Sequence, residues 1–185
     1  MKKLTPLSLL IFLSLSLTAC GSDSWQQDVS YLKPEQIEKS NLAIKENLEK
    51  IAETPELVDA YFQLGFHYQA LGQYKKAEEY YNLTIELDPA FTTPYNNLAV
   101  IYEEVGEYKK AAVVIKELYQ LNPLNRTEVL SDAVRIYLKN DDPDSAQAIL
   151  QDFNQSLNPE DKPKYQPLVS DLYDKVFNYR QKNEK

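Results

Sequence analysis

A six-residue pattern in this chain recurs 34 residues after its first appearance. Gly72-Gln-Tyr-Lys-Lys-Ala77 returns as Gly106-Glu-Tyr-Lys-Lys-Ala111. A fixed period of this length is typical of a solenoid of helix–turn–helix units, in which each unit buries its apolar face only against its neighbours. The period therefore predicts an extended stack of helix pairs, an architecture that usually presents a binding surface.

The start of the chain has the features of a secretory signal. Lys2 and Lys3 precede an apolar run over residues 7–17, which is shorter than the ~20 residues that a membrane-spanning helix needs. Cys20, the only cysteine, follows in Leu-Thr-Ala-Cys-Gly, which resembles the lipobox of bacterial lipoproteins. The resemblance implies removal of residues 1–19, acylation of Cys20 and a membrane-held protein on the extracytoplasmic side, at the outer membrane or in the periplasm if the host has two membranes. The alternatives are an uncleaved anchor and an unpaired signal-peptide cysteine.

The acidic composition disfavours nucleic-acid binding. The formal net charge is −8, and it becomes −10 when residues 1–19, with Lys2 and Lys3, are removed. Phosphate backbones are bound through Lys and Arg, so this chain matches them poorly, and it matches an anionic lipid surface poorly as well. We expect a protein or peptide partner, with the acyl chains on Cys20 as the contact with the membrane.

Two repeat units, 58–91 and 92–125, agree at nine positions. The matched pairs are Tyr61 and Tyr95, Leu64 and Leu98, Gly65 and Ala99, Tyr68 and Tyr102, Gly72 and Gly106, Tyr74 and Tyr108, Ala77 and Ala111, Leu87 and Leu121, and Pro89 and Pro123. This pattern closely resembles the tetratricopeptide repeat (TPR), which implies an all-α, right-handed α-solenoid. The small residues allow helices to approach, the glycines allow a left-handed turn, and the prolines end the second helices. The paired lysines are expected to face solvent.

The period weakens after Pro123. A third unit over 126–159 keeps Ala133 in register but places Tyr137 and Ala146 one residue late, which predicts a one-residue insertion in or near its first helix. Its turn replaces glycine chemistry with a capping Asp142 and with Pro143 at the first helical position.

Helices flank the repeats on both sides. Pro34 opens a predicted helix over 34–54, and an amphipathic helix over 162–183 is expected to cap the solenoid or, alternatively, to bind a partner. We therefore expect eight helices in a single domain over 34–183. It follows a lipidated tether over 20–33, in which Trp25 packs on the first helix or is mobile.

Catalytic motifs are scarce. His67 is the sole histidine and is predicted to be solvated, and the chain has neither a Gly-x-Ser-x-Gly motif nor a phosphate-binding glycine loop. Neighbouring acids such as Asp141 and Asp142 suit helix caps and solvated faces better than a metal site. We expect no enzyme activity, no metal and no cofactor.

The TPR resemblance places the binding groove on the first helix of each unit. The groove positions that carry over are Phe62, Gln63 and Phe66 in the first unit and Asn96, Asn97 and Val100 in the second, flanked by Asp59, Thr93, Glu103 and Glu104. Aromatic side chains beside amides suit an extended or helical peptide. The variant of the family that clamps C-terminal carboxylates is disfavoured, because Phe62 and Phe66 replace its Lys and Asn. The alternative is that the helix over 34–54 already covers these phenylalanines.

The expected function is that of a lipid-anchored protein-interaction module of the bacterial cell envelope. Similar short TPR lipoproteins serve in pilus assembly, as adaptors of wall hydrolases and in envelope assembly. The alternative is a structural or self-associating element that uses its tyrosine-rich outer face or its C-terminal helix, and an enzyme is the third hypothesis.

Overall fold

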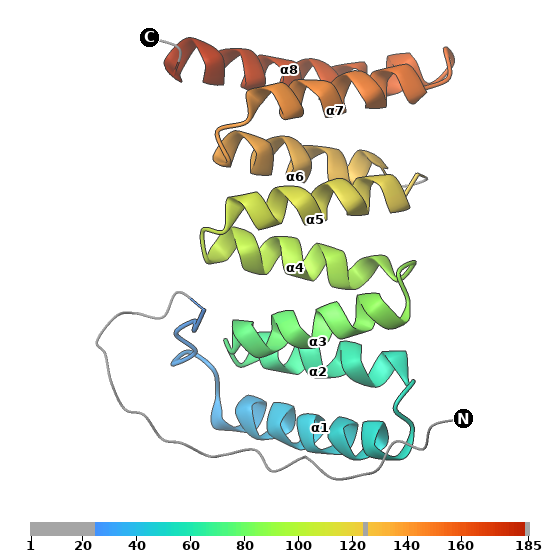
Figure 1. The fold of residues 1–185 in the computed structure, drawn as a ribbon. Coiled ribbons are helices and arrows are strands. Elements are labelled where there is room, and N and C mark those ends of the chain that lie inside the picture. Colours follow the sequence, from blue (N-terminus) through green and yellow to red (C-terminus); the bar gives the residue numbers. More distant parts are fainter. Residues whose placement is uncertain (1–24, 124–125, 184–185) are drawn as a thin grey trace, which may run out of the picture.

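The computed structural model describes residues 25–123 and 126–183, which form eight α-helices and no β-strand (Figure 1). The predicted signal segment and Cys20 lie outside the described residues. The helices are α1 (Pro34–Glu53), α2 (Val58–Ala70), α3 (Tyr74–Leu87), α4 (Thr92–Glu104), α5 (Tyr108–Leu121), α6 (Arg126–Lys139), α7 (Pro143–Ser156) and α8 (Lys162–Asn183). They stack in chain order, which confirms the predicted all-α repeat solenoid. None of the described helices has both the length and the apolar character needed to cross a bilayer.

The turns inside the repeats have the predicted left-handed backbone. Gly72 and Gly106 have φ values of +66° and +80°, which glycine adopts without steric cost. In the third repeat Asp141 takes this place, with φ of +56°. Its offset from Gly106 is one residue more than the repeat period, and α6 has 14 residues where α4 has 13. The predicted insertion is therefore confirmed and lies in the first helix of the unit.

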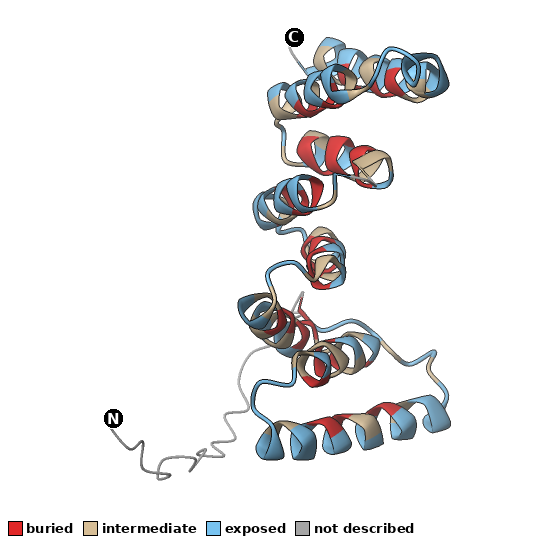
Figure 2. Ribbon diagram, turned by 90° about the vertical axis from the view of Figure 1, so that its right-hand side faces the viewer, coloured by how far each residue is buried: buried red, intermediate tan, exposed pale blue. Residues whose placement is uncertain are grey.

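Buried residues lie where successive helices face one another (Figure 2). The contact between α2 and α3 is so close at Gly65 that an added Cβ would lie 2.6 Å from Cδ1 of Tyr81. Tyr81 is fully buried. The second repeat holds Ala99 and Ile115 at the same two positions. Alanine is larger than glycine there, and it faces an isoleucine side chain in place of a tyrosine ring.

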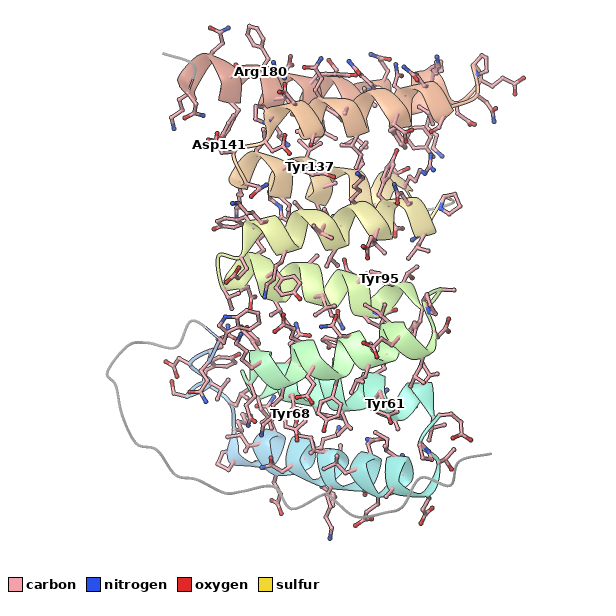
Figure 3. All side chains as sticks on the ribbon, in the orientation of Figure 1. Tyr61, Tyr68, Tyr95, Tyr137, Asp141 and Arg180 are labelled. Carbon is pink, nitrogen blue, oxygen red and sulfur yellow. The ribbon has the colours of Figure 1, made fainter. Side chains whose placement is uncertain are left out.

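Tyrosine hydroxyls fix the start of the first two repeats. Tyr61 donates a hydrogen bond of 2.9 Å to the carbonyl of Pro55, and Tyr95 donates one of 3.1 Å to the carbonyl of Pro89. Both rings lie along the same edge of the stack (Figure 3). The aromatic position of the repeat therefore serves the loop that enters the unit as well as the core.

α1 packs along α2 and half-buries His67. Nδ1 of His67 lies 3.4 Å from Oγ of Ser40, and the ring of Phe66 meets the imidazole edge-on at 5.3 Å. Burial, with the nearby charge of Lys39 as the smaller cause, holds the pKa of His67 below its usual value. The prediction of a solvated histidine was wrong, because an alignment of repeats says nothing of the helix that precedes them.

Residues 25–29, which we call the strap, bind to the turn between α2 and α3. The amide of Tyr74 donates a hydrogen bond of 3.1 Å to the carbonyl of Trp25, and the amide of Gln27 donates one of 3.1 Å to the carbonyl of Gly72. Trp25 is only 7 % exposed. Its ring lies edge-on to Tyr102 at 6.0 Å, with Nζ of Lys75 3.7 Å from the ring centroid. The described part of the predicted tether is thus docked, and Trp25 packs on the repeats rather than on α1.

Replacing Gly65 with alanine should lower the free energy of unfolding by about 1–3 kcal/mol, because the new methyl group overlaps the ring of Tyr81. The double variant Gly65→Ala/Tyr81→Ile copies the pair Ala99 and Ile115. Its loss should therefore be smaller than the sum of the two single losses. Urea unfolding followed by circular dichroism measures all three; additive losses would contradict the steric account.

The stability of the α1–α2 contact should depend on the protonation of His67. The unfolded state has a histidine pKa of about 6.5 and the folded state a lower one, so the unfolded state binds more protons between these values. The free energy of unfolding should therefore rise with pH up to about 6.5 and then level off. His67→Gln should flatten this part of the profile while leaving the carboxylate-dependent part below about pH 5 unchanged. Urea unfolding between about pH 5 and pH 8 tests this, and equal slopes in both proteins would refute it.

Candidate protein-binding surface

The first helices of the first two repeats expose apolar side chains at the same position. Phe66 on α2 is 49 % exposed and Val100, one repeat period later on α4, is 39 % exposed. Adjacent units of a solenoid align equivalent positions side by side, so these two residues belong to one surface. We call it the α2–α4 patch, made of Phe62, Gln63, Phe66, Asn96, Asn97 and Val100.

Phe62 is the more enclosed of the two predicted phenylalanines. Its ring packs against Phe91 at 5.0 Å and against Tyr81 at 5.9 Å, so it supports the start of α4. α1 packs along α2 and covers His67, but the neighbouring Phe66 stays half exposed. The alternative in which α1 covers both phenylalanines therefore does not describe this structure.

The amides of the α2–α4 patch differ in how they are held. Nδ2 of Asn97 donates a hydrogen bond of 2.9 Å to Oη of Tyr81, which in turn donates one of 2.7 Å to Oε1 of Gln69. Burial raises the pKa of Tyr81, so its hydroxyl stays protonated. Asn97 is thus fixed through α3 to α2. Asn96 is exposed and Gln63 is half-buried, and within the described residues neither side chain makes a hydrogen bond.

A cluster of charged side chains borders the patch. Glu103 at the end of α4 forms ion pairs with Arg135 and, at 2.6 Å, with Lys139, both from α6. Burial alone would raise the pKa of Glu103, but the hydrogen bonds from these two cations outweigh it and hold that pKa below its usual value. Glu103 was predicted as a flanking residue of the groove, but neither cation was predicted, because the inserted residue in α6 hides their register.

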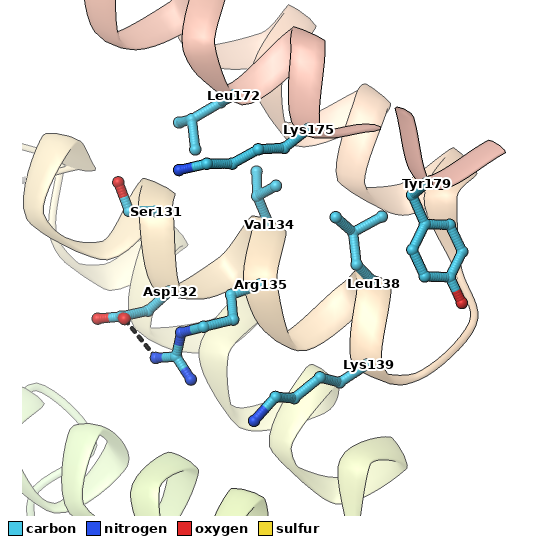
Figure 4. A pocket seen from close by; sticks show the side chains of 9 residues that line it. All are labelled: Ser131, Asp132, Val134, Arg135, Leu138, Lys139, Leu172, Lys175 and Tyr179. Carbon is cyan, nitrogen blue, oxygen red and sulfur yellow. Dashed lines mark hydrogen bonds and ion pairs between the residues drawn. The ribbon is translucent and has the colours of Figure 1, made fainter. Parts of the chain in front are cut away.

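A cavity of 680 Å³ lies between α6 and α8 (Figure 4). Leu172, Lys175 and Tyr179 of α8 face Val134, Leu138 and Lys139 of α6 across it. α8 packs on α6 as well as on α7, and Leu130 and Val134, which hold groove positions of the third repeat, are buried. The groove positions with exposed apolar side chains are therefore those of the first two repeats.

The α2–α4 patch combines apolar side chains with amides. Over residues 25–123 and 126–183, no three His, Cys, Asp or Glu side chains are grouped so that they could hold a metal ion. The patch has half-exposed apolar side chains and two amides, Gln63 and Asn96, without hydrogen-bond partners among the described residues. Ion-paired side chains border it. These are the features by which a groove recognises a peptide.

Two solved structures share the fold. The MamA protein is 20 % identical in sequence, with a TM-score of 0.57 over 68 % of this chain and 67 % of that chain. The N-terminal domain of stress-induced protein-1 (STI-1) from C. elegans is 22 % identical, with a TM-score of 0.50 over 66 % of this chain and 93 % of that chain. Both are TPR-containing proteins, so the predicted TPR fold is confirmed. No curated protein sequence matches the chain.

A match to a protein family covers most of the strap and all three repeats. The family described as N-terminal acetyltransferase A, auxiliary subunit, matches residues 26–162, which is well over half of the chain. The chain therefore belongs to the family of N-terminal acetyltransferase A auxiliary subunits.

Proposed function

We propose that this protein is a non-catalytic scaffold that holds a segment of a partner protein on the α2–α4 patch. The observation that carries the proposal is the exposure of Phe66 and Val100 at one position of two consecutive repeats. A side chain of this kind contributes about 1.5–3 kcal/mol when fully buried, so half-exposed ones offer roughly 1 kcal/mol each to a partner. Asn96 and Gln63 can then satisfy the backbone groups of the bound segment.

The border of the patch would decide which segments fit. Glu103 and Asp132 balance the charges of Arg135 and Lys139, so an incoming charge gains little unless it displaces one member of the cluster. This favours a partner segment that is apolar at its centre and polar but uncharged at the end that faces α6.

The family description supports a helper role. An auxiliary subunit accompanies an enzyme instead of acting as one, which agrees with a scaffold that needs no catalytic group. We therefore propose that the chain has no enzyme activity of its own and that its partner is a protein.

We further propose that acyl chains on Cys20 hold this scaffold at a membrane, on the extracytoplasmic side of a bacterial cell envelope. The support is the lipobox-like sequence around the sole cysteine, directly after a signal-like segment. Two or three acyl chains on one residue give stable anchoring, which a single chain does not.

A self-associating structural role is the second candidate. Phe177 on the last helix is 60 % exposed, and an exposed aromatic residue on a terminal helix is a possible contact between copies of the chain.

Replacing both Phe66 and Val100 with aspartate should abolish partner capture, because it puts charges where apolar area would be buried. Val113→Asp is the matched control, since Val113 is 58 % exposed but lies on α5, outside the patch. Cross-linking and pull-down from the membrane fraction, quantified by mass spectrometry, should show at least tenfold less partner for the double variant only. An unchanged partner set would rule out the patch, and a set lost only in Phe177→Asp would favour the second candidate.

Replacing Cys20 with serine should release the protein from membranes, because the hydroxyl cannot take the thioether-linked lipid. Cell fractionation followed by immunoblotting measures the shift from the membrane to the soluble fraction. Ser22→Ala, two residues away, controls for effects on export. Membrane retention of the serine variant would refute the acyl anchor and leave the patch proposal standing.

A further inference from the structure

The three turns between the first and second helices of the repeats lie along one edge of the solenoid (Figure 1). Each is built on one left-handed residue, Gly72, Gly106 or Asp141. Because the backbone is the same at all three, the turns can be compared group by group.

The strap covers the first turn. It pairs antiparallel with Gln73 through the two backbone hydrogen bonds to Gly72 and Tyr74. The fit is close, because a Cβ on Gly72 would lie 2.7 Å from the carbonyl oxygen of Gln27 and 2.9 Å from Cγ1 of Val29. The glycine is therefore needed both for its φ value and for the approach of the strap.

The end of α8 covers the third turn. The hydroxyl of Tyr179 donates a hydrogen bond of 2.8 Å to Asp141, and Nη2 of Arg180 lies 2.6 Å from Oδ1 of Asp144. Asp141 and Arg180 lie on the same edge in Figure 3. In addition, Pro143 starts α7 and has no amide hydrogen, so this turn cannot pair with an extended chain as the first one does.

The middle turn has the sequence of the first and no cover within the described residues. A Cβ on Gly106 would meet no described atom within 4 Å. The amide of Tyr108, at the first position of α5, has no acceptor in its own helix, and no other described group accepts from it. A surface hollow of 270 Å³ is lined by Gly106, Glu107, Tyr108, Lys109 and Asn140.

We propose that the middle turn binds an extended segment of a partner protein, paired with Gly106 and Tyr108 as the strap is paired with Gly72 and Tyr74. One carbonyl and one amide two residues apart fit the backbone of an extended chain. The strap shows that this kind of turn accepts such a chain in this fold. The site lies apart from the α2–α4 patch and does not depend on the function proposed above.

The side chains around the middle turn define the segment that fits. Lys109 is the repeat equivalent of Lys75, whose ammonium group lies over the ring of Trp25. We therefore expect the partner to place an aromatic residue next to Lys109. Lys139 lies 5.7 Å from the ring centroid of Tyr108, at the position where Glu104 approaches Tyr74 in the first repeat. Lys139 also pairs with Glu103, but it is a hydrogen-bond donor where Glu104 is an acceptor, so the partner should carry an acidic acceptor where the strap carries Gln27.

The glycine amides provide a direct test, because the chain has only four glycines. The probe is an acetylated and amidated peptide with the sequence of residues 25–30 in which Gln27 is replaced by glutamate. Added to full-length protein labelled with ¹⁵N-glycine, it should shift the Gly106 signal saturably and leave Gly65, inside α2, unmoved. No Gly106 shift at about millimolar peptide, or a shift of Gly72 alone through exchange with the strap, would overturn the proposal.

Two substitutions at one position isolate the backbone contact. Tyr108→Pro removes the amide donor and copies the third turn, where Pro143 holds the same position. The backbone before it is similar in the two turns, because ψ is 56° at Glu107 and 70° at Asp142. Tyr108→Ala loses the same ring but keeps the donor. The proline variant should bind the peptide about tenfold more weakly than the alanine variant, with the other glycine signals of both variants reporting an intact fold. Equal affinity of the two variants would overturn the proposal.

Discussion

The structure depends on how closely the two helices of a repeat approach one another. In the first repeat that distance is set by Gly65 against the buried ring of Tyr81. The hydroxyl of the same ring links Asn97 on α4 to Gln69 on α2, so one side chain holds three helices together. Each unit contacts only its neighbours, so the distance between the helices of the first repeat affects where the second repeat packs. The exposed positions of α2 and α4 align as a result.

The repeat architecture could be predicted from the sequence because every part of it recurs at a fixed spacing. The left-handed glycines, the terminal prolines and the insertion in α6 are all visible as matches or shifts of the 34-residue period. The contacts made by non-repeated segments could not be predicted. The carbonyl of Trp25 accepts a hydrogen bond from the amide of Tyr74, 49 residues later, and His67 is covered by a helix outside the repeat pattern. Neither contact leaves a periodic signal.

The candidate surface was only partly predictable for the same reason. Phe66 and Val100 follow from the repeat positions, and both are exposed. The repeat pattern does not indicate, however, that Phe62 packs against Phe91, or that Asn97 donates a hydrogen bond to Tyr81. The boundary of the surface at the third repeat depends on α8 packing on α6, where Leu172 faces Val134. This is a tertiary contact between segments of unrelated pattern.

The docked strap has a consequence for how the protein would stand on a membrane. Only residues 21–24 separate Cys20 from the buried Trp25, so an acylated Cys20 could lie at most about 18 Å from the fold, given some 3.6 Å per residue. If residues 21–33 were all free, the reach would be roughly 50 Å, well over twice as far. The docked strap would therefore shorten the linker to the membrane and keep one edge of the solenoid close to the bilayer surface. Large folded partners could then approach only from the opposite edge or the open faces, and the middle turn on the near edge would admit only a narrow extended segment.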